Sequence, residues 1–332
     1  MEETSFDLKP ARKAFSRIGF AMSAILVIAT VLQLLYILIS KAIWGPESWF
    51  ISSSWGMWIG SFAPVYLVAI PAGLLIMRKL PTQKPEDNKL SFRQLFVFIP
   101  MSMCLMYIGN LIGNALSMLL SGGQAQNALM NYAMDTNPIK ILVVVILAPL
   151  LEEFVCRKQI IDRTRQYGEK TAVFLSAFVF ALLHKNLFQF FYAFALGIIF
   201  AYIYTRTGRL RYSVILHAFV NFLGSVVAPW VLSYVDLEAI ANLDPNLPAE
   251  ELMQTMISIL PGYLLLMVYA NLLMGLSIFG LVLLLIRRKK TQWQQSDAQL
   301  PKGKAGKTVL LNVGMILYMV ICTIFIIAAL FP

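Results

Sequence analysis

Long apolar runs separated by short polar segments dominate this sequence. Nine such runs can be marked, and most approach the roughly 20 residues that a helix needs to cross a bilayer. Their approximate bounds are 18–40, 55–77, 94–120, 138–160, 170–186, 187–205, 213–235, 257–286 and 308–331. The runs are continuous rather than alternating, so a β-barrel is not expected. The pattern predicts an all-α, polytopic membrane helix bundle with about nine transmembrane helices.

Composition strengthens this prediction. Of the 332 residues, 59% are hydrophobic and 13% are charged, whereas about a quarter of the residues in a soluble domain are charged. An ordinary soluble enzyme and a disordered chain are both excluded. The three cysteines, Cys104, Cys156 and Cys322, are far apart, so neither a disulfide framework nor a zinc knuckle is expected.

The basic residues are distributed as membrane topology requires. The net charge is +10, and 24 of the 27 Lys and Arg residues fall on alternate segments between the runs. This asymmetry predicts a cytoplasmic N-terminus and gives no support for nucleic-acid binding. The first run follows four basic residues and is too long for the core of a signal peptide, so we interpret it as a retained signal anchor.

The chain divides into three parts by this pattern. Residues 1–137 hold the first three helices, 138–235 a core of four helices, and 236–332 an outer loop and the last two helices. The polar segment 287–307 is expected to be a flexible loop that isolates the last helix. Gly109 and Gly113 form a small-xxx-small pair, which predicts a close approach of two helices.

Two of the nine runs contain too few consecutive uncharged residues to cross a membrane. Only 11 uncharged residues separate Lys140 from Glu152, and 13 separate Lys170 from His184. Each run must therefore carry ionisable groups into the bilayer, at a cost of at least ~2.5–3.5 kcal/mol for a charge. Such groups are candidates for function.

The first group of candidates is Glu152, Glu153 and Arg157. Arg157 follows Glu153 by four residues, a spacing that permits an ion pair on one helix face. Glu152 and Glu153 are adjacent and point about 100° apart, so the ion pair would hold Glu153 and leave Glu152 facing a cavity. A structural alternative is that the pair only sets topology at the membrane interface.

The second group contains both histidines of the chain. His184 and His217 lie inside predicted spans, and histidine moves protons readily near neutral pH. Asn221 follows His217 by four residues, so both side chains lie on one helix face. The structural alternatives are that His184 is a packing residue and that His217 and Asn221 are hydrogen-bonding groups between helices.

In these residues the sequence resembles the CPBP family, the CAAX proteases and bacteriocin-processing enzymes, also called the Abi family. The family shows three motifs on successive membrane helices. Here they are Glu152-Glu153-x-x-x-Arg157, Phe180-x-x-x-His184 and His217-x-x-x-Asn221. The resemblance covers about residues 138–225, and Lys158 departs from the glycine that many members have there.

The resemblance implies an intramembrane endopeptidase. Glu152 would be the general base that activates water, and His184 would polarise the water or carry its proton. His217 and Asn221 would stabilise the oxyanion, with Glu153 and Arg157 as supporting residues. A buried base and oxyanion donors suit amide hydrolysis. No metal ligand or cofactor is expected, and the partners would be a peptide or protein substrate and the lipid bilayer.

Two other classes of function stay open from the residues. One is a zinc metalloprotease, because Glu and His bind zinc, although HExxH is absent and Asn is a poor zinc ligand. The other is a non-catalytic membrane binding or immunity protein. A transporter is a weaker alternative, since repeated halves are not evident. The chain would be a multi-pass protein of the cell membrane if it is bacterial.

Overall fold

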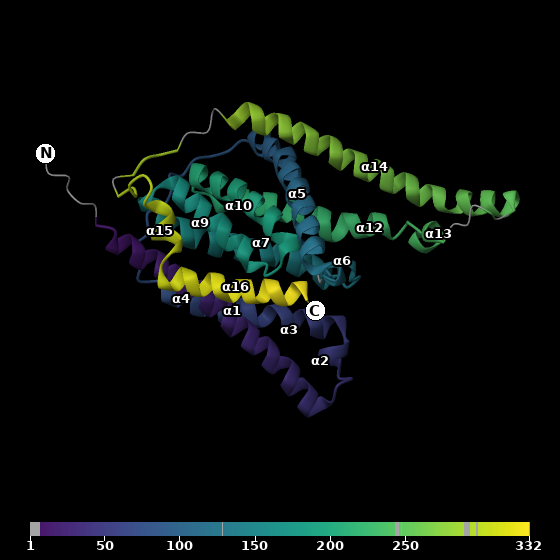
Figure 1. The fold of residues 1–332 in the computed structure, drawn as a ribbon, viewed down its shortest axis with the longest axis horizontal. Helices are drawn as coiled ribbons and strands as arrows, with labels where there is room; N and C mark the ends of the chain where they lie inside the picture. The colour runs from purple at the N-terminus through teal and green to yellow at the C-terminus, as the bar shows by residue number, and fades with distance from the viewer. Residues whose placement is uncertain are drawn as a thin grey trace.

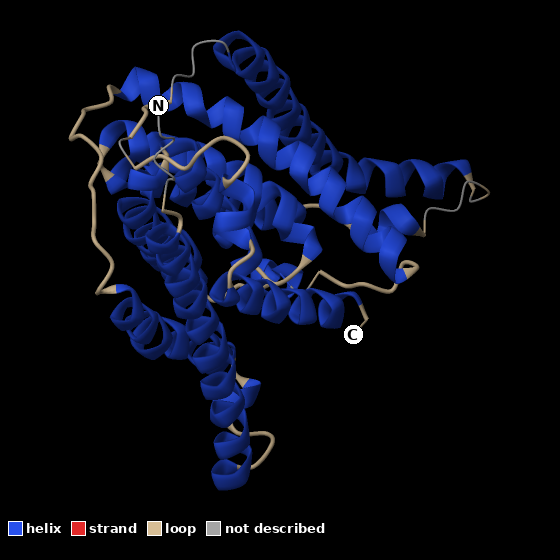
Figure 2. Cartoon of the chain, turned by 60° about the vertical axis from the view of Figure 1, so that its left-hand side comes forward, coloured by secondary structure: helices blue, strands red, loops and turns tan. Residues whose placement is uncertain are grey.

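The protein is all-helical in the computed structural model (Figure 2). The structure describes residues 7–127, 129–242, 246, 248–288, 293–296 and 298–331, and no strand occurs among them. This confirms the predicted fold class, a polytopic helix bundle.

Seven helical units in the described part are long and apolar enough to cross a membrane. They are α1 (Lys9–Trp44), α3–η1–α4 (Ser54–Met77), α5 (Phe92–Ser121), α10 (Leu187–Thr207), α11–η5–α12 (Leu210–Leu232), α14 (Ala249–Arg287) and α16 (Val313–Leu330). Four short helices connect them or flank their ends: α2 (Trp49–Ser52), α6 (Leu129–Met134), α13 (Leu237–Ala241) and α15 (Ala305–Leu310). Each long unit corresponds to one of the predicted apolar runs.

The two remaining predicted runs are helical but do not qualify as spans. One is a composite helix at 141–164, which contains η2, α7, η3 and α8 (Ile160–Thr164). The other is α9 (Glu169–Leu183), which has 15 residues and is linked to α8 by the short 3₁₀ turn η4 (Arg165–Tyr167). These are the two runs whose ionisable residues were expected to enter the bilayer.

The central helices pack closely because small residues line one contact. α10 packs against both α5 and α9, and α14 also packs against α5. A Cβ added to Gly109 would lie 2.5 Å from Tyr192 Cα, and one added to Gly113 would lie 2.6 Å from the Leu187 carbonyl oxygen. The predicted role of this glycine pair is therefore confirmed. Figure 1 shows α5 crossing beside α10, with α14 along one edge of the molecule.

Sharp turns set the position of α10 between its neighbours. Asn186 caps its N-terminus, with the side chain accepting from the Gln189 N–H at 2.9 Å. Gly208 ends the helix at φ 62°, and a Cβ there would lie 2.6 Å from the Glu86 carbonyl oxygen. Only glycine fits this left-handed position, so α11 starts at a fixed angle directly afterwards.

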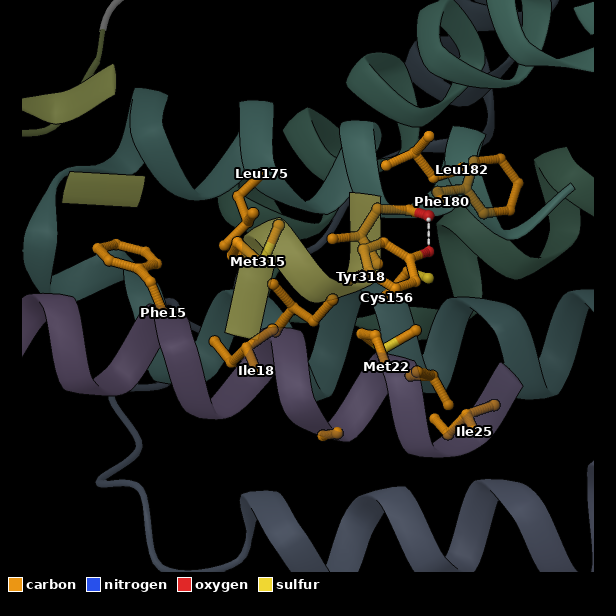
Figure 3. Close-up of a cluster of buried hydrophobic side chains, with 14 of the residues drawn as sticks. Phe15, Ile18, Met22, Ile25, Cys156, Leu175, Phe180, Leu182, Met315 and Tyr318 are labelled. Atoms are coloured by element: carbon orange, nitrogen blue, oxygen red, sulfur yellow. Dashed lines mark hydrogen bonds between the residues drawn. The ribbon is translucent and has the colours of Figure 1, made fainter. Parts of the chain in front are cut away.

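The last helix is not isolated, which corrects the expectation from the polar loop. α16 packs along α1, and a Cβ on Gly314 would lie 1.8 Å from the Ser16 carbonyl oxygen. The buried Tyr318 hydroxyl donates to the Val179 carbonyl of α9 at 3.0 Å, the dashed line in Figure 3. These contacts place α16 within the core that Phe15, Met22 and Phe180 share.

The loop before α16 is also attached to the bundle where it is described. The Gln294 N–H donates to Glu169 Oε2 at 2.7 Å, and the Leu300 N–H donates to the Tyr167 carbonyl at 3.1 Å. Leu300 is buried. The loop therefore joins the last helix to the start of α9 instead of separating it.

Candidate active site

The two carboxylates lie in a composite helix that changes between π-helical and α-helical segments. The π-helical segments η2 (Ile141–Leu147) and η3 (Phe154–Gln159) flank the α-helical segment α7 (Ala148–Glu153). A π-helix bonds from i to i+5 and turns more slowly than an α-helix, and short π segments are frequent at functional sites. Glu152 and Glu153 are the last two residues of α7, so they stand at the boundary between the two kinds of turn.

Glu153 and Arg157 form the ion pair predicted from their spacing. Arg157 Nη2 lies 3.0 Å from Glu153 Oε1, and both side chains are fully buried. The guanidinium carbon also lies 4.4 Å from the ring centroid of Phe180 and 5.5 Å from that of Phe200. Its Nη1 donates to Ser176 Oγ at 3.4 Å. With a carboxylate and two ring faces around it, Arg157 is held in one position and fixes Glu153.

His217 lies between the two carboxylates. Helix α11 brings its Nδ1 to 3.1 Å from Glu153 Oε1 and its Nε2 to 3.8 Å from Glu152 Oε2. An ionised carboxylate only accepts hydrogen bonds, so Nδ1 donates to Glu153 and Nε2 is directed towards Glu152. The ring of Phe200 stacks on the imidazole with centroids 5.1 Å apart. Glu153 is therefore more than an anchor for Arg157, because it also orients His217.

The two glutamates differ in exposure as their adjacent positions predict. The side chain of Glu152 is 32% exposed, whereas that of Glu153 is 0% exposed. Successive residues on a helix point in directions about 100° apart, so one carboxylate enters the core while its neighbour does not. Glu152 is the carboxylate that another molecule can reach.

His184 ends helix α9 close to the same group. Its Nδ1 lies 2.9 Å from the Phe180 carbonyl oxygen, which only accepts, so Nδ1 donates and Nε2 remains for another contact. The centroid of its imidazole lies 5.0 Å from that of the Phe180 ring, which in turn lies 5.5 Å from that of His217. The next residue, Lys185, has φ 58°, and this left-handed turn leads directly into the cap of α10.

Asn221 connects its helix to the helix of the glutamates. Its Nδ2 donates to the Val144 carbonyl oxygen of η2 at 2.9 Å. An amide NH₂ carries two hydrogens, so one of them is used in this contact and one remains. Among the interactions described, neither Asn221 nor His184 makes a side-chain hydrogen bond or ion pair with another of the six predicted site residues.

A comparison with known families agrees with this geometry. Residues 135–223 match the family model described as type II CAAX prenyl endopeptidase Rce1-like. Residues 135–223 therefore form a domain similar to the Rce1-like endopeptidases. This confirms the resemblance to CAAX proteases over the region that holds the three motifs. No curated protein and no solved structure was found to match the chain.

The structure adds residues to the Rce1-like domain that the motifs do not name. Phe200 contacts both His217 and Arg157, and Ser176 accepts from Arg157 while donating to the Cys156 carbonyl at 2.8 Å. Nothing in the sequence distinguishes them, since Phe200 is one of 22 phenylalanines. Their roles depend on how α9 and α10 pack against η3.

The donor atoms of this domain bear on whether it could hold a metal ion. Within the described residues, no group of three or more His, Cys, Asp and Glu side chains has a spacing that could hold a metal ion. Glu153 is bound to Arg157 and His217, and Nδ1 of His184 is bound to the backbone. Glu153 and the Nδ1 atoms of both histidines are thus bound to protein partners, whereas Glu152 and the two Nε2 atoms make no hydrogen bond within the described residues.

Proposed function

We propose that this protein is an intramembrane endopeptidase that hydrolyses a peptide bond by means of a water molecule activated by Glu152. The observation that carries the proposal is the position of His217 between an accessible and a buried carboxylate, inside a membrane helix bundle. The Rce1-like domain supports the reaction class. Because that family description names prenylated CAAX substrates, a membrane-anchored peptide ending in a prenylated CAAX sequence is the first substrate to test.

In the proposed reaction, Glu152 takes a proton from water and the water oxygen attacks the carbonyl carbon of the substrate. His184 Nε2 contacts the water and helps to position it. The second N–H of Asn221 and Nε2 of His217 donate to the oxygen that becomes negative. Glu153 accepts from Nδ1 throughout, so it holds the imidazole at the required angle.

The charges of the group balance when His217 is protonated. The Nδ1 proton is used by Glu153, so His217 can donate from Nε2 only as an imidazolium. Two cations, Arg157 and His217, then face two carboxylates. Balanced charges are needed in a low-dielectric interior, because an unpaired buried charge is strongly unfavourable.

The test is cleavage of a fluorogenic prenylated CAAX peptide by the purified full-length chain in lipid vesicles. The Glu152→Gln variant should insert and accumulate like the unmodified chain but lose cleavage. Equal rates for the two proteins would remove Glu152 from the mechanism. If the unmodified chain binds such peptides without cleaving any of them, a non-catalytic binding protein is the better description.

We also propose that the reaction needs no metal ion. The proposal is supported by Glu153, whose Oε1 is bound to Arg157 and His217, and by the described residues, which contain no group of three or more side chains that could hold a metal ion. Activity should persist after extended treatment with a chelator, and the purified chain should contain well under one zinc ion per molecule. Loss of activity on chelation, with recovery on adding zinc, would favour a metalloprotease.

A further inference from the structure

An aromatic ring outside the three motifs covers one face of the His217 imidazole. The rings of Phe200 and His217 have centroids 5.1 Å apart and planes inclined by 23°, so they are stacked. Phe180 also contacts the imidazole, with centroids 5.5 Å apart, but the planes of these two rings are inclined by 86°. Among the described aromatic contacts of His217, the contact with Phe200 is therefore the one that lies parallel to the imidazole plane.

The stacked ring supplies a restraint that the hydrogen bond of His217 lacks. Nδ1 donates to Glu153 Oε1 at 3.1 Å, and a single hydrogen bond fixes the position of that nitrogen but not the orientation of the ring plane. An imidazole that turns about the N–H···O direction keeps the bond while Nε2 moves away from its place. A flat ring packed on the imidazole face prevents this turn, because a close-packed interior leaves no space for it.

Phe200 is itself held firmly enough to act as such a restraint. Its side chain is fully buried and belongs to the same hydrophobic cluster as Leu216 and Val220 of α11. Three residues earlier, Gly197 brings α10 close to α9, since a Cβ at this glycine would lie 2.9 Å from Ala177 Cα. Residues three apart lie next to one another on a helix face, so the close approach at Gly197 also fixes the ring of Phe200.

The same ring contacts the other cation of the site. The guanidinium carbon of Arg157 lies 5.5 Å from the centroid of Phe200. The face of an aromatic ring carries negative partial charge and attracts cations that lie within about 6 Å of its centroid. His217 is positively charged in the proposed reaction, so Phe200 interacts with both cations that Glu153 neutralises. An aliphatic side chain at this position would provide neither the flat surface nor the attraction.

We propose that Phe200 is a positioning residue, whose ring face holds the His217 imidazolium in the plane that directs Nε2 at the oxygen that becomes negative. The inference rests on the proposed function. The side chain of Phe200 has no exposed surface, so it acts through His217 and does not touch the substrate. Loss of the ring should therefore leave substrate binding unchanged and slow the chemical step, which requires exact placement of the donor.

The test measures kcat and KM for the prenylated CAAX peptide in the same lipid vesicles. Phe200→Leu keeps an apolar side chain but removes the flat face. It should lower kcat by about 10²-fold, which is the cost of a misplacement of about 1 Å, while KM stays nearly unchanged. Phe200→Tyr keeps the ring and should retain most of the kcat of the unmodified chain.

Phe188→Leu is the matched control for the loss of a buried ring. Phe188 is a buried residue of the same helix, and it makes none of the described aromatic contacts with a predicted site residue. We expect Phe188→Leu and Phe200→Leu to lower the thermal midpoint of unfolding, and only Phe200→Leu to lower kcat. If Phe200→Leu does not accumulate, Phe200→Met takes its place, because methionine adapts its shape to irregular gaps and also lacks a ring.

Three results would overturn the role of Phe200. The first is an equal kcat for Phe200→Leu and Phe188→Leu, and the second is a raised KM with unchanged kcat for Phe200→Leu. The third is a kcat for a stably folded Phe200→Tyr as low as that of Phe200→Leu.

Glu152→Gln, measured alongside, separates this inference from the proposed function. If Glu152→Gln is inactive and Phe200→Leu keeps the kcat of the control, only the role of Phe200 is wrong. If Glu152→Gln cleaves the peptide as fast as the unmodified chain, the proposed function itself fails.

Discussion

Glu153 has two partners that compete for one oxygen atom. Its Oε1 lies 3.0 Å from Arg157 Nη2 and 3.1 Å from His217 Nδ1. A single carboxylate therefore neutralises a buried guanidinium and orients the histidine of another helix. The adjacent Glu152 has no such partner at hydrogen-bond distance among the described residues and keeps its proton-accepting capacity for another molecule. The two glutamates have different roles because adjacent residues of a helix point in directions about 100° apart.

Replacing Glu153 should affect stability more than replacing Glu152. Glu153→Gln leaves Arg157 as an unpaired buried cation, and breaking a buried pair costs ~3–5 kcal/mol. We expect Glu153→Gln to accumulate less and to unfold at a lower temperature than Glu152→Gln, which affects a side chain that is 32% exposed. Thermal unfolding in detergent measures both. Equal midpoints for the two variants would contradict the assignment of Glu153 as the structural anion.

Asn221 should affect both rate and stability. Asn221→Ala removes the hydrogen bond to Val144, worth about 1 kcal/mol, and the proposed oxyanion donor, worth about 10²–10³ in kcat. Asn114→Ala is the control, because Asn114 Nδ2 also donates to a helix carbonyl, that of Asn110, at 2.9 Å. A rate near that of the unmodified chain for Asn221→Ala would remove it from the mechanism and leave only its role between helices.

At the scale of elements, α16 packs against α9, the helix that leads to His184. Tyr318 of α16 donates to Val179, the residue before Phe180, and the Lys185 ammonium lies 5.2 Å from the ring centroid of Phe325. α16 thus contacts α9 on both sides of the segment that ends at His184. α16 in turn is fixed by its close crossing with α1. The position of His184 depends in this way on a helix that carries none of the three motifs.

The crossing of α1 and α16 should not tolerate a methyl group. Gly314→Ala would place its Cβ 1.8 Å from the Ser16 carbonyl oxygen, so the two helices must separate. Overpacking of this kind costs about 1–3 kcal/mol. Gly275→Ala in α14 is the matched control, since nothing lies within 4 Å of its Cβ. Thermal unfolding of both variants tests this, and an unchanged midpoint for Gly314→Ala would show that the crossing is not tight.

At the scale of the whole molecule, the basic segments gather at one end. The 24 Lys and Arg residues expected on the cytoplasmic side lie in five segments, 9–17, 78–93, 157–170, 206–211 and 287–307. The last four of these segments are connected by hydrogen bonds. The contacts include Gln83 with Asp162, Asn88 with Thr207, and Gln294 with Glu169. Segments that share one side of a membrane can meet in this way, so the contacts agree with the distribution of Lys and Arg.

Orientation in the membrane can be tested with reporters at two positions. A fusion after Lys302, in the basic loop, should give a cytoplasmic signal, and one after Asn242, between α13 and α14, an external signal. The expectation follows from the excess of Lys and Arg on one set of segments. If both signals were reversed, the protein would have the opposite orientation in the membrane. If the two reporters gave the same signal, α14 would not cross the membrane.

The sequence by itself determined the helical fold, the positions of its long helices, and the ion pair of Glu153 with Arg157. These features are local, because hydrophobic run length and a four-residue spacing act within one helix. The two runs that lacked enough apolar residues were also identifiable, and they contain Glu152, Glu153, Arg157 and His184. The Gly109 and Gly113 pair was readable because small residues permit close packing wherever a partner helix lies.

Only the tertiary structure decided which helices meet and which atoms face each other. His217 lies 64 positions from Glu153, and its contact with both carboxylates depends on the rotation of α11 against α7, which no spacing encodes. The same holds for Phe200, which stacks on the imidazole. The polar loop 287–307 suggested an isolated last helix, because composition cannot show that a segment is fixed by contacts to residues far away in the chain.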